Sequence, residues 1–552
     1  MLNKIDILDT TLRDGEQATQ GFKDGKDSKL EIAHKLTELG VDTIEAGFPH
    51  SSPKDFEAVS AIAKEVKGPY IAALARTIKE DIDKAWEAIK SNEKPTLHVF
   101  TYMVNKDAID SYKITPKEIM DESVKGVSLA RSLIGDKGRV EFSAQNLIFA
   151  VLEALKNKDN DSLNFLADLY GKTIEAGADI INLPDTEGRV LPTQMKDAVE
   201  YLLGSVGEKY SLKNKIVSVH CHNDLGNAVA NSIAAISAGA TQIECTINGI
   251  GERAGNAALE EVVMNIWTHK EYLKAYTNIK TEKLNEISRI VSDHTGWDIS
   301  PNKPIVGQNV FRHSSGIHWD GKEKGENAGK KIYEIFNKEI VGWTGESNQL
   351  TARSGKRGVH ARLLRLGYKI SINEVESKVM PIYTGIADEK KLLDDIDLRA
   401  IMDEVYPKSQ KVGYITHSLL KETDDPTQNG RVTLEINGSS KTSRWFNEEG
   451  SLDSLSKAVK SLLSECEIPT LVYYNVRNVG KSHSATAEVT IVLSENGINN
   501  KGTSEEGWDG DVRLGKPVYI GRSRHNDVPT ASIIAYVKAV NNCLNAANQK
   551  PL

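Results

Sequence analysis

The chain has few cysteines and no long apolar run. Its four cysteines, Cys221, Cys245, Cys466 and Cys543, are widely separated, and no two of them form a C-x-x-C pair. This spacing argues against a cysteine-based zinc site and favours a reducing compartment, so we expect a cytoplasmic protein. No apolar segment approaches the roughly 20 residues needed to cross a bilayer. The first residues lead directly into a segment with candidate functional groups, which leaves no room for a signal or transit peptide.

The chain also lacks an excess of positive charge. Its formal net charge is -8 and its isoelectric point is near 6.0, so there is no electrostatic footprint for nucleic acid or an anionic membrane. An apolar content of 39% and a charged content of 26% are typical of a soluble globular protein. A length of 552 residues predicts about two to four domains.

The first half of the chain repeats a short β-branched run followed by a helical pattern. The segment Lys29–Gly40, for example, has Ala33, Leu36 and Leu39 at helical spacing and ends in a glycine suited to a C-terminal cap. Eight such units in about 270 residues predict an α/β fold of the (β/α)8 TIM-barrel type, with a doubly wound open sheet as the alternative. The predicted strands are Ile5–Asp9, Val41–Ala46, Tyr70–Ala75, Thr96–Thr101, Arg139–Ser143, Ala178–Leu183, Lys215–His220 and Thr241–Ile247.

A TIM barrel carries its functional groups just past the C-terminal ends of its strands. Polar residues end or follow every predicted strand, and although loops are polar in any protein, good metal ligands are among these residues. In chain order they are Arg13, Asp14, Glu16, Glu45, Arg76, His98, Ser143, Gln145, Asp185, Thr186, His220, His222, Asn248, Glu252, Arg253 and Asn256.

Two of these residues, His220 and His222, stand one residue apart at the end of the seventh predicted strand. Side chains i and i+2 of a strand point to the same face, so both imidazoles project together. Imidazole is a common ligand of Zn, Mn, Fe and Co. The pair alone is equally typical of two surface histidines, but with Asp14 supplied after the first strand it predicts a divalent-metal site.

Three long motifs follow one another along the barrel: Asp9–Gln17 (DTTLRDGEQ), His220–Gly226 (HCHNDLG) and Asn248–Asn256 (NGIGERAGN). Together they resemble the 2-isopropylmalate synthase family, which belongs to the metal-dependent TIM barrels that condense or cleave acyl-CoA and 2-oxoacids. Gly47–Pro53 (GFPHSSP) and Leu350–Gly355 (LTARSG) resemble the isopropylmalate branch more than homocitrate synthases. The likeness extends over most of the chain.

The resemblance implies a divalent metal (Mg, Mn or Zn) held by Asp14, His220 and His222, with Asn256 nearby. This ligand set leaves positions open at which a 2-oxoacid chelates, and the metal polarises its keto carbon. Arg13 is implied to add positive charge at the developing alkoxide, with a plain salt bridge to a carboxylate as its alternative role. The resemblance also allows K+ as an activator.

Further residues are assigned to the two substrates. His98 and Thr186 resemble the family's contacts to the oxoacid, and Ser143 and Glu45 are candidates for the same role. The co-substrate acetyl-CoA must lose a proton from its methyl group before its thioester is hydrolysed. By resemblance His318 and Tyr333, beyond the barrel, reach an active site, often that of the partner subunit of a homodimer. His318 as a structural loop residue is the alternative, and the identity of the base stays open.

The chain departs from the family pattern in a few places. The family usually has Ser-x-Glu-Asp-Ala-x-Arg after strand five, whereas Ser143–Phe149 (SAQNLIF) has Gln145 in place of the glutamate and lacks the arginine. Gln145 keeps the hydrogen-bonding shape of the catalytic glutamate but cannot carry its charge or proton. Arg189 stands where an aromatic residue is usual, and Trp319 replaces a usual glutamine. We expect an altered oxoacid preference, slower chemistry, or a substitute carboxylate such as Glu187.

The organisation of the second half follows from pattern and resemblance. We expect a barrel in residues 1–277, helical connecting subdomains in 278–410 and a C-terminal α+β regulatory domain in 411–552. The last contains a repeat, in which Arg431–Gly438 parallels Ala487–Gly497 and each is followed by a short strand, a turn and a helix, which predicts two βββα-like units. This arrangement resembles the leucine-binding regulatory domain of long isopropylmalate synthases, with a pure packing domain as the alternative. Asp453 and Asp527 lie at predicted helix N-termini suited to an effector carboxylate.

The expected function is condensation of acetyl-CoA with 3-methyl-2-oxobutanoate to 2-isopropylmalate, the first committed step of leucine biosynthesis, under leucine inhibition. The same chemistry on pyruvate or 2-oxoglutarate (a citramalate or homocitrate synthase) is the close alternative. A catalytically impaired, amino-acid-sensing homologue is another, because of Gln145. A lyase running in the cleavage direction is a third.

Overall fold

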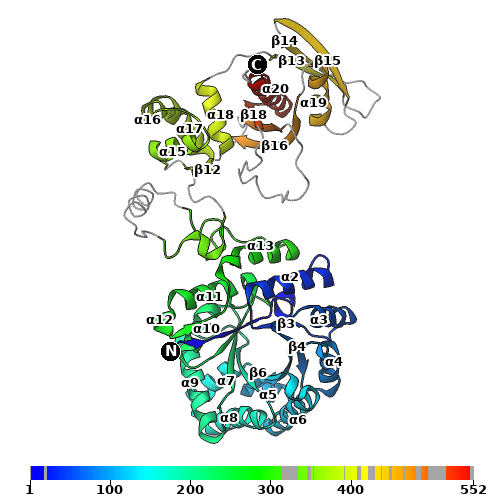
Figure 1. The fold of residues 1–552 in the computed structure, drawn as a ribbon, viewed down its shortest axis with the longest axis vertical. Coiled ribbons are helices and arrows are strands. Elements are labelled where there is room, and N and C mark those ends of the chain that lie inside the picture. Colours follow the sequence, from blue (N-terminus) through cyan, green and yellow to red (C-terminus); the bar gives the residue numbers. More distant parts are fainter. Residues whose placement is uncertain are drawn as a thin grey trace. The chain divides into compact units, whose positions relative to one another are not determined.

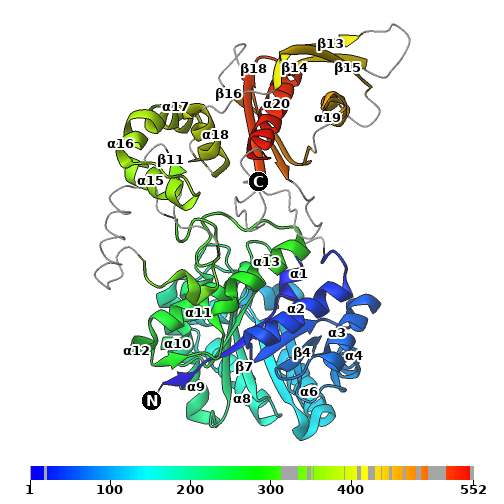
Figure 2. The same cartoon turned by 45° about the horizontal axis from the view of Figure 1, so that its top comes forward.

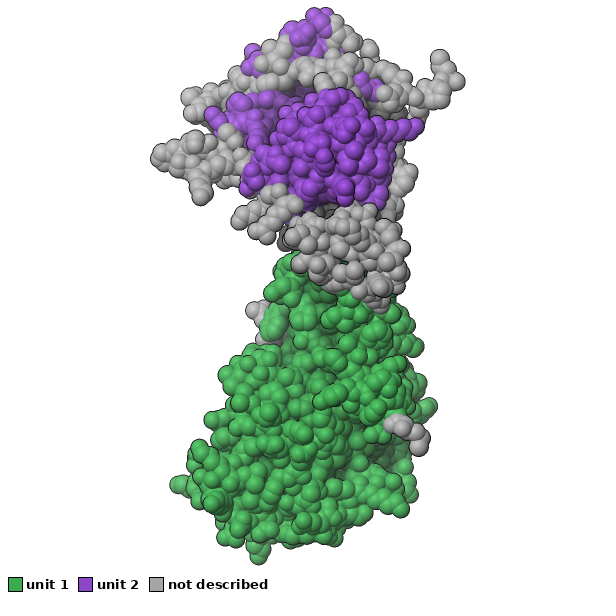
Figure 3. Space-filling model, turned by 90° about the vertical axis from the view of Figure 1, so that its left-hand side faces the viewer, with its two compact units in different colours: residues 1–311, 334–345 green, residues 312–333, 346–552 purple. Residues whose placement is uncertain are grey.

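The computed structural model describes most of the chain and divides it into two compact units. One unit comprises residues 1–311 and 334–345, and the other comprises residues 312–333 and 346–552 (Figure 3). The described residues are 2–17, 21–312, 334–344, 350–351, 354–390, 392–393, 395–406, 412–420, 429–436, 438–446, 451–463, 468–479, 486–494 and 518–547.

A closed barrel of eight parallel strands, β2 to β9, forms the centre of the first unit, and helices surround it (Figure 1). The last strand returns to the first, with Asp6 opposite Gln242 and Asp9 opposite Cys245. The predicted TIM barrel is therefore confirmed, and each predicted strand is present. The strands are β2 (Asp6–Asp9), β3 (Thr43–Gly47), β4 (Tyr70–Arg76), β5 (Pro95–Met103), β6 (Arg139–Gln145), β7 (Ile180–Asp185), β8 (Ile216–Cys221) and β9 (Gln242–Cys245).

The outer helices bury one apolar face against the barrel, as α2 illustrates. Its residues Ile32, Ala33, Leu36 and Leu39 are buried, and Gly40 ends the helix in the left-handed conformation (φ 96°), which only glycine adopts at little cost. The helices of this unit are α1 (Asp14–Gln17), α2 (Lys26–Leu39), α3 (Pro53–Glu65), α4 (Lys79–Ile89), α5 (Lys106–Tyr112), α6 (Pro116–Ile134), α7 (Leu147–Asn157), α8 (Asn160–Glu175), α9 (Pro192–Lys209), α10 (Ala228–Ser237), α11 (Leu259–Thr268), α12 (Lys270–Leu273) and α13 (Leu284–Thr295).

Two short strands lie outside the barrel. β1 (Asn3–Lys4) pairs in parallel with β10 (Ala275–Tyr276), so the segment before the first barrel strand is joined to the segment after the last barrel helices.

The interior of the barrel is unusually polar. TIM barrels are mostly filled by branched apolar side chains, yet Glu45, His98, Glu141 and Glu244 are all buried here. Burying ionisable groups is costly unless they are paired, so this interior is expected to form one bonded network with the groups at the mouth.

The second unit contains a helical segment and two three-stranded antiparallel sheets (Figure 2). Each sheet is followed by one helix, which confirms the two predicted βββα-like units. In the helical segment the elements are β11 (Leu350–Thr351), α15 (Lys356–Arg365), α16 (Ile372–Glu374), a π-helical turn (Val375–Val379), α17 (Met380–Lys390), β12 (Leu392–Leu393) and α18 (Asp395–Val405). The repeat consists of β13 (Val412–Leu420), β14 (Asn429–Ile436), β15 (Ser439–Phe446) and α19 (Ser451–Leu462), then β16 (Thr470–Val479), β17 (Thr486–Ser494), β18 (Val518–His525) and α20 (Val528–Ala547). Among the described helices, none combines the length and the apolar character needed to span a membrane.

Candidate active site at the barrel mouth

The three predicted metal ligands converge at the C-terminal end of the barrel. Asp14 opens α1 directly after β2, and His220 and His222 end β8. One ligand atom from each lies within 4.8 Å of the other two, and the three residues are between 3% and 7% exposed. One carboxylate and two imidazoles at this spacing suit a divalent cation that keeps open coordination positions.

Hydrogen bonds fix the two imidazoles so that their Nε2 atoms face each other. His220 Nδ1 lies 2.9 Å from Glu244 Oε2, and His222 Nδ1 lies 3.3 Å from the Gly255 carbonyl, so in each ring Nδ1 is the donor. The two Nε2 atoms lie 3.2 Å apart. Burial and the neighbouring His220 lower the pKa of His222 to about 4, which keeps that ring neutral. Two imidazole nitrogens held this close together beside a carboxylate suit shared coordination of one divalent cation, so the residues fit a metal.

The acidic ligand is held in its charged form. Burial alone would raise the pKa of Asp14, but the charges of Arg13 and His220 outweigh it and hold that pKa well below its usual range. Asn256 Nδ2 donates to Asp14 Oδ1 (2.8 Å), while Asn256 Oδ1 is buried without a hydrogen-bond partner among the described groups. An unsatisfied amide oxygen next to the ligands suits a metal-bound water, as the resemblance implied.

The loop after β9 must come very close to these ligands. A side chain on Gly251 would place its Cβ 2.0 Å from Asn256 Nδ2 and 2.8 Å from Asp14 Oδ1. Glycine is therefore required at this position, and the adjacent Glu252 N–H donates to Asp14 Oδ1 (3.2 Å).

Arg13 bridges the metal ligands and the barrel interior. Its Nε donates to Glu45 Oε2 and its Nη1 donates to Asp14 Oδ2, both at 2.6 Å. Thr10 Oγ1 donates to the same Glu45 oxygen (2.7 Å). The salt bridge that was the alternative role of Arg13 is thus present, and it fixes the guanidinium beside the ligand carboxylate.

Two predicted oxoacid contacts, His98 and Ser143, lie inside the barrel below the mouth. His98 Nδ1 bonds Glu45 Oε1 (2.7 Å), its Nε2 donates to Ser143 Oγ (2.6 Å), and Asn182 Nδ2 also donates to Ser143 Oγ (2.9 Å). Burial lowers the pKa of His98, but the charges of Glu141 and Glu45 outweigh it and raise that pKa to about 9. His98 is therefore a cation at neutral pH.

The sequence reasoning missed Glu141 and Glu244. Glu244 bonds the metal-ligand ring of His220, and Glu141 accepts a hydrogen bond from Gln242 Nε2 (3.1 Å). Burial, only partly opposed by the charge of His98, raises the pKa of Glu141 well above its usual range. The available signal was a glutamate in the middle of a predicted barrel strand, because a charged residue that is buried there needs a partner inside the barrel.

The ends of β6 and β7 carry Gln145 and Thr186. Gln145 ends β6 and is half-buried. The next residue, Asn146, adopts the left-handed conformation (φ 60°), and its N–H donates to Thr186 Oγ1 (2.8 Å). The loops after β6 and β7 are thereby connected, and both lie outside the ligand cluster.

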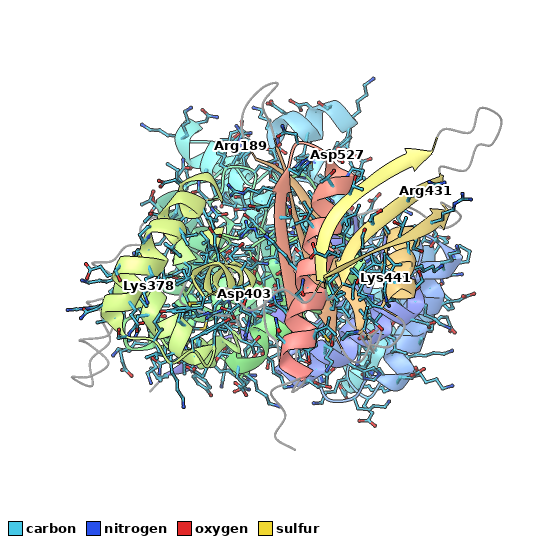
Figure 4. All side chains as sticks on the ribbon, turned by 90° about the horizontal axis from the view of Figure 1, so that it is seen from above. Arg189, Lys378, Asp403, Arg431, Lys441 and Asp527 are labelled. Carbon is cyan, nitrogen blue, oxygen red and sulfur yellow. The ribbon has the colours of Figure 1, made fainter. Side chains whose placement is uncertain are left out.

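Several predicted residues are not brought to the mouth by the described structure. His318, Tyr333 and Trp319 lie outside the described residues. Asp453 lies in the first turn of α19, but its side chain is outside the described part. Asp527, labelled in Figure 4, precedes α20, and its Oδ2 accepts hydrogen bonds from the Thr530 N–H (2.9 Å) and hydroxyl (2.6 Å). Asp527 therefore caps this helix.

Family models match three consecutive parts of the chain. They are HMGL-like (residues 4–291), Homocitrate synthase post-HMGL domain-like (residues 305–391) and the LeuA allosteric (dimerisation) domain (residues 392–544). A 2-isopropylmalate synthase of Pelotomaculum thermopropionicum is 38% identical over 98% of both chains. Another, of Pyrococcus furiosus, is 37% identical over 98% of this chain and 99% of the relative. The chain belongs to the 2-isopropylmalate synthase family. It is accordingly an acyltransferase-type condensing enzyme of the acetyl-CoA-dependent group, with a TIM barrel and an allosteric domain.

Proposed function

We propose that this enzyme condenses acetyl-CoA with 3-methyl-2-oxobutanoate to give 2-isopropylmalate and CoA, the first committed step of leucine biosynthesis. The observation that carries the proposal is the full-length match to relatives of that name, which includes the allosteric domain. The complete ligand set of Asp14, His220 and His222 at the mouth supports the same chemistry.

In this proposal Asp14, His220 and His222 hold a divalent metal, and Asn256 faces one of its waters. A bound divalent metal supplies a Lewis acid that polarises the keto group of the oxoacid. Arg13, held by Glu45 and Asp14, keeps a fixed positive charge next to the oxygen that becomes the alkoxide. Thr186 and the Ser143–His98 pair orient the oxoacid, and Gln145 offers it a neutral hydrogen-bonding group.

The remaining steps concern acetyl-CoA. A base removes a proton from the methyl group, and the resulting carbon attacks the keto carbon, whose oxygen becomes an alkoxide and takes up a proton. Water then hydrolyses the thioester and releases CoA. His318 and Tyr333 are our candidates for proton transfer and orientation, contributed by the partner subunit of a homodimer. The LeuA allosteric (dimerisation) domain supports both the dimer and its regulation by leucine.

The proposal also covers the identity of the cation, the activator and the cellular compartment. Two imidazoles and one carboxylate suit Mn or Zn at least as well as Mg, because imidazole is a softer ligand than water or carboxylate. K+ is our candidate activator. Cys221 and Cys245 are free buried thiols, which favours a reducing cytoplasm.

Gln145 motivates two other functions. The first is the same condensation with pyruvate or 2-oxoglutarate, since the loss of a carboxylate beside the oxoacid changes which side chain it tolerates. The second is an impaired homologue that senses an amino acid without turnover. For the second function the wild-type protein releases no CoA with any oxoacid, while a Gln145→Glu variant recovers release.

The test is a free-thiol assay of the full-length protein with acetyl-CoA, Mg or Mn, and each of the three oxoacids, with and without leucine and K+. We expect the highest kcat/KM with 3-methyl-2-oxobutanoate and a lower rate with leucine. A higher kcat/KM with pyruvate or 2-oxoglutarate would contradict the proposed substrate. Unchanged rates with leucine would contradict the proposed regulation.

A further inference from the structure

A cation–π contact joins the two loops on the Gln145 side of the mouth. The guanidinium carbon of Arg189, labelled in Figure 4, lies 4.0 Å from the ring centroid of Phe149. Phe149 belongs to the first turn of α7, which follows Gln145, and Arg189 belongs to the loop after β7, which carries Thr186. The contact therefore spans the same two loops as the hydrogen bond from the Asn146 N–H to Thr186 Oγ1.

The contact needs one cation and one ring. Placing an arginine at both positions would bring two cations together, and placing an aromatic residue at both would remove the cation, whereas exchanging the two residue types keeps one cation on one ring.

The surroundings of Arg189 anchor its backbone and leave its side chain at the surface. The buried carboxylate of Asp185 accepts from the Arg189 N–H (3.3 Å). Arg189 Nη1 pairs with Glu187 Oε2 at 2.9 Å, but these side chains are 50% and 40% exposed, so the ion pair is screened and contributes little to stability. A contact of this kind acts on the spacing of the loops more than on the stability of the barrel.

We infer that Phe149 and Arg189 are a specificity-determining positioning pair whose stacking sets the distance between Gln145 and Thr186, and thereby the fit of the oxoacid. The inference rests on the proposed function for the choice of oxoacid.

The test is a four-cornered cycle of the wild type, Arg189→Phe, Phe149→Arg and the double variant that exchanges the two residues. We expect each single variant to raise KM for 3-methyl-2-oxobutanoate about five- to tenfold, and the double variant to return within about twofold of wild type. The KM for acetyl-CoA and the affinity for Mn2+ stay unchanged, since neither depends on this spacing.

A matched control is available at the other end of the barrel. Arg139 stacks on Tyr70 at 3.7 Å near the start of β6, far from the strand ends that carry the site. Arg139→Leu removes a comparable contact and is expected to leave the KM for the oxoacid unchanged. If the variants acted through a general loss of barrel stability, the KM for the oxoacid would change in the Arg139→Leu control as well as in the Phe149 and Arg189 variants.

Calorimetric titration of the oxoacid into each Mn2+-loaded variant, without acetyl-CoA, repeats the cycle without turnover. If the wild type binds the oxoacid but releases no CoA, the proposed function is refuted. The binding data would still test the role of Phe149 and Arg189. Single variants with unchanged oxoacid KM and affinity, or a double variant whose loss is the product of the two single losses, would overturn the inference.

Discussion

The two sides of the barrel mouth are built differently. On one side Asp14, His220 and His222 are buried, and each is fixed by a partner such as Arg13, Glu244 or the Gly255 carbonyl. On the other side Gln145 and Thr186 are only half-buried. There a backbone hydrogen bond and a half-exposed stacking contact connect the loops.

The difference follows the chemistry that each side must support. Metal ligands need fixed positions and protonation states, and buried hydrogen bonds supply both. A surface that recognises an oxoacid side chain can change residues in pairs without disturbing the ligands. Gln145, Phe149 and Arg189 accordingly lie outside the ligand cluster. The predictions below test this division from the largest expected effect to the smallest.

Removing the charge of a ligand is expected to have the largest effect. Asp14→Asn keeps the shape of the side chain but loses the anion that balances the metal. We expect CoA release to fall about a thousandfold or more, because the Lewis acid supplies several kcal/mol. Mn2+ binding measured by electron paramagnetic resonance should be lost in parallel. Asp224→Asn, an exposed carboxylate paired with Arg253 nearby, is the control and should keep Mn2+ affinity.

The charged state of His98 should give the protein a pH-dependent stability. Its pKa of about 9 in the folded state lies above the ordinary value of about 6.5, so the folded state binds the extra proton more tightly. The stabilisation is complete below pH 6.5 and disappears as the pH rises through 9. We expect it to reach about 3 kcal/mol in the unfolding free energy, measured by denaturant titration. A His98→Gln variant should lack this pH dependence. If the unfolding free energies of the variant and the wild type change with pH in the same way, the prediction is refuted.

Two glutamates in the barrel interior should respond differently to the same substitution. Glu244→Gln removes the anion that holds His220 and should weaken Mn2+ binding about 10- to 100-fold. Glu141 bonds Gln242, whereas Glu244 bonds His220 directly, so Glu141→Gln should weaken Mn2+ binding less than about threefold. Equal losses in the two variants would show that burial, and not charge, governs this network.

The smallest expected effect concerns the backbone on the Gln145 side. Asn146 has a positive φ of 60°, which costs a β-carbon-bearing residue about 1–2 kcal/mol and glycine almost nothing. Asn146→Ala should therefore unfold at a free energy about 1 kcal/mol lower than Asn146→Gly. Both variants lose the hydrogen bond to Asn105, so their difference isolates the backbone term. Denaturant titration of the two proteins provides the measurement.

The barrel and the convergence of Asp14, His220 and His222 were predictable from the sequence because their signals are local. The spacing of His220 and His222 places both side chains on one face of a strand, and Gly40 directly after an apolar helical pattern marks the end of a helix. Glu141 and Glu244 were not predicted, since their role depends on which strands close the barrel and face each other across it. The contact between Phe149 and Arg189 was not predicted either, because the two residues lie 40 positions apart in the sequence and only the folded barrel brings them together.

The pairing of β1 with β10 has a consequence for how such a barrel can be rearranged. The Asn3 N–H donates to the Lys274 carbonyl (2.7 Å) and the Ile5 N–H to the Tyr276 carbonyl (2.9 Å), so the segments before the first and after the last barrel strand lie side by side along one seam. A short linker across that seam would close the chain at a small entropic cost. The module could then be cut at an exposed loop and circularly permuted with every barrel strand kept. Extra segments of the polypeptide can likewise be inserted at this seam without interrupting the ring of strands that carries Asp14, His220 and His222.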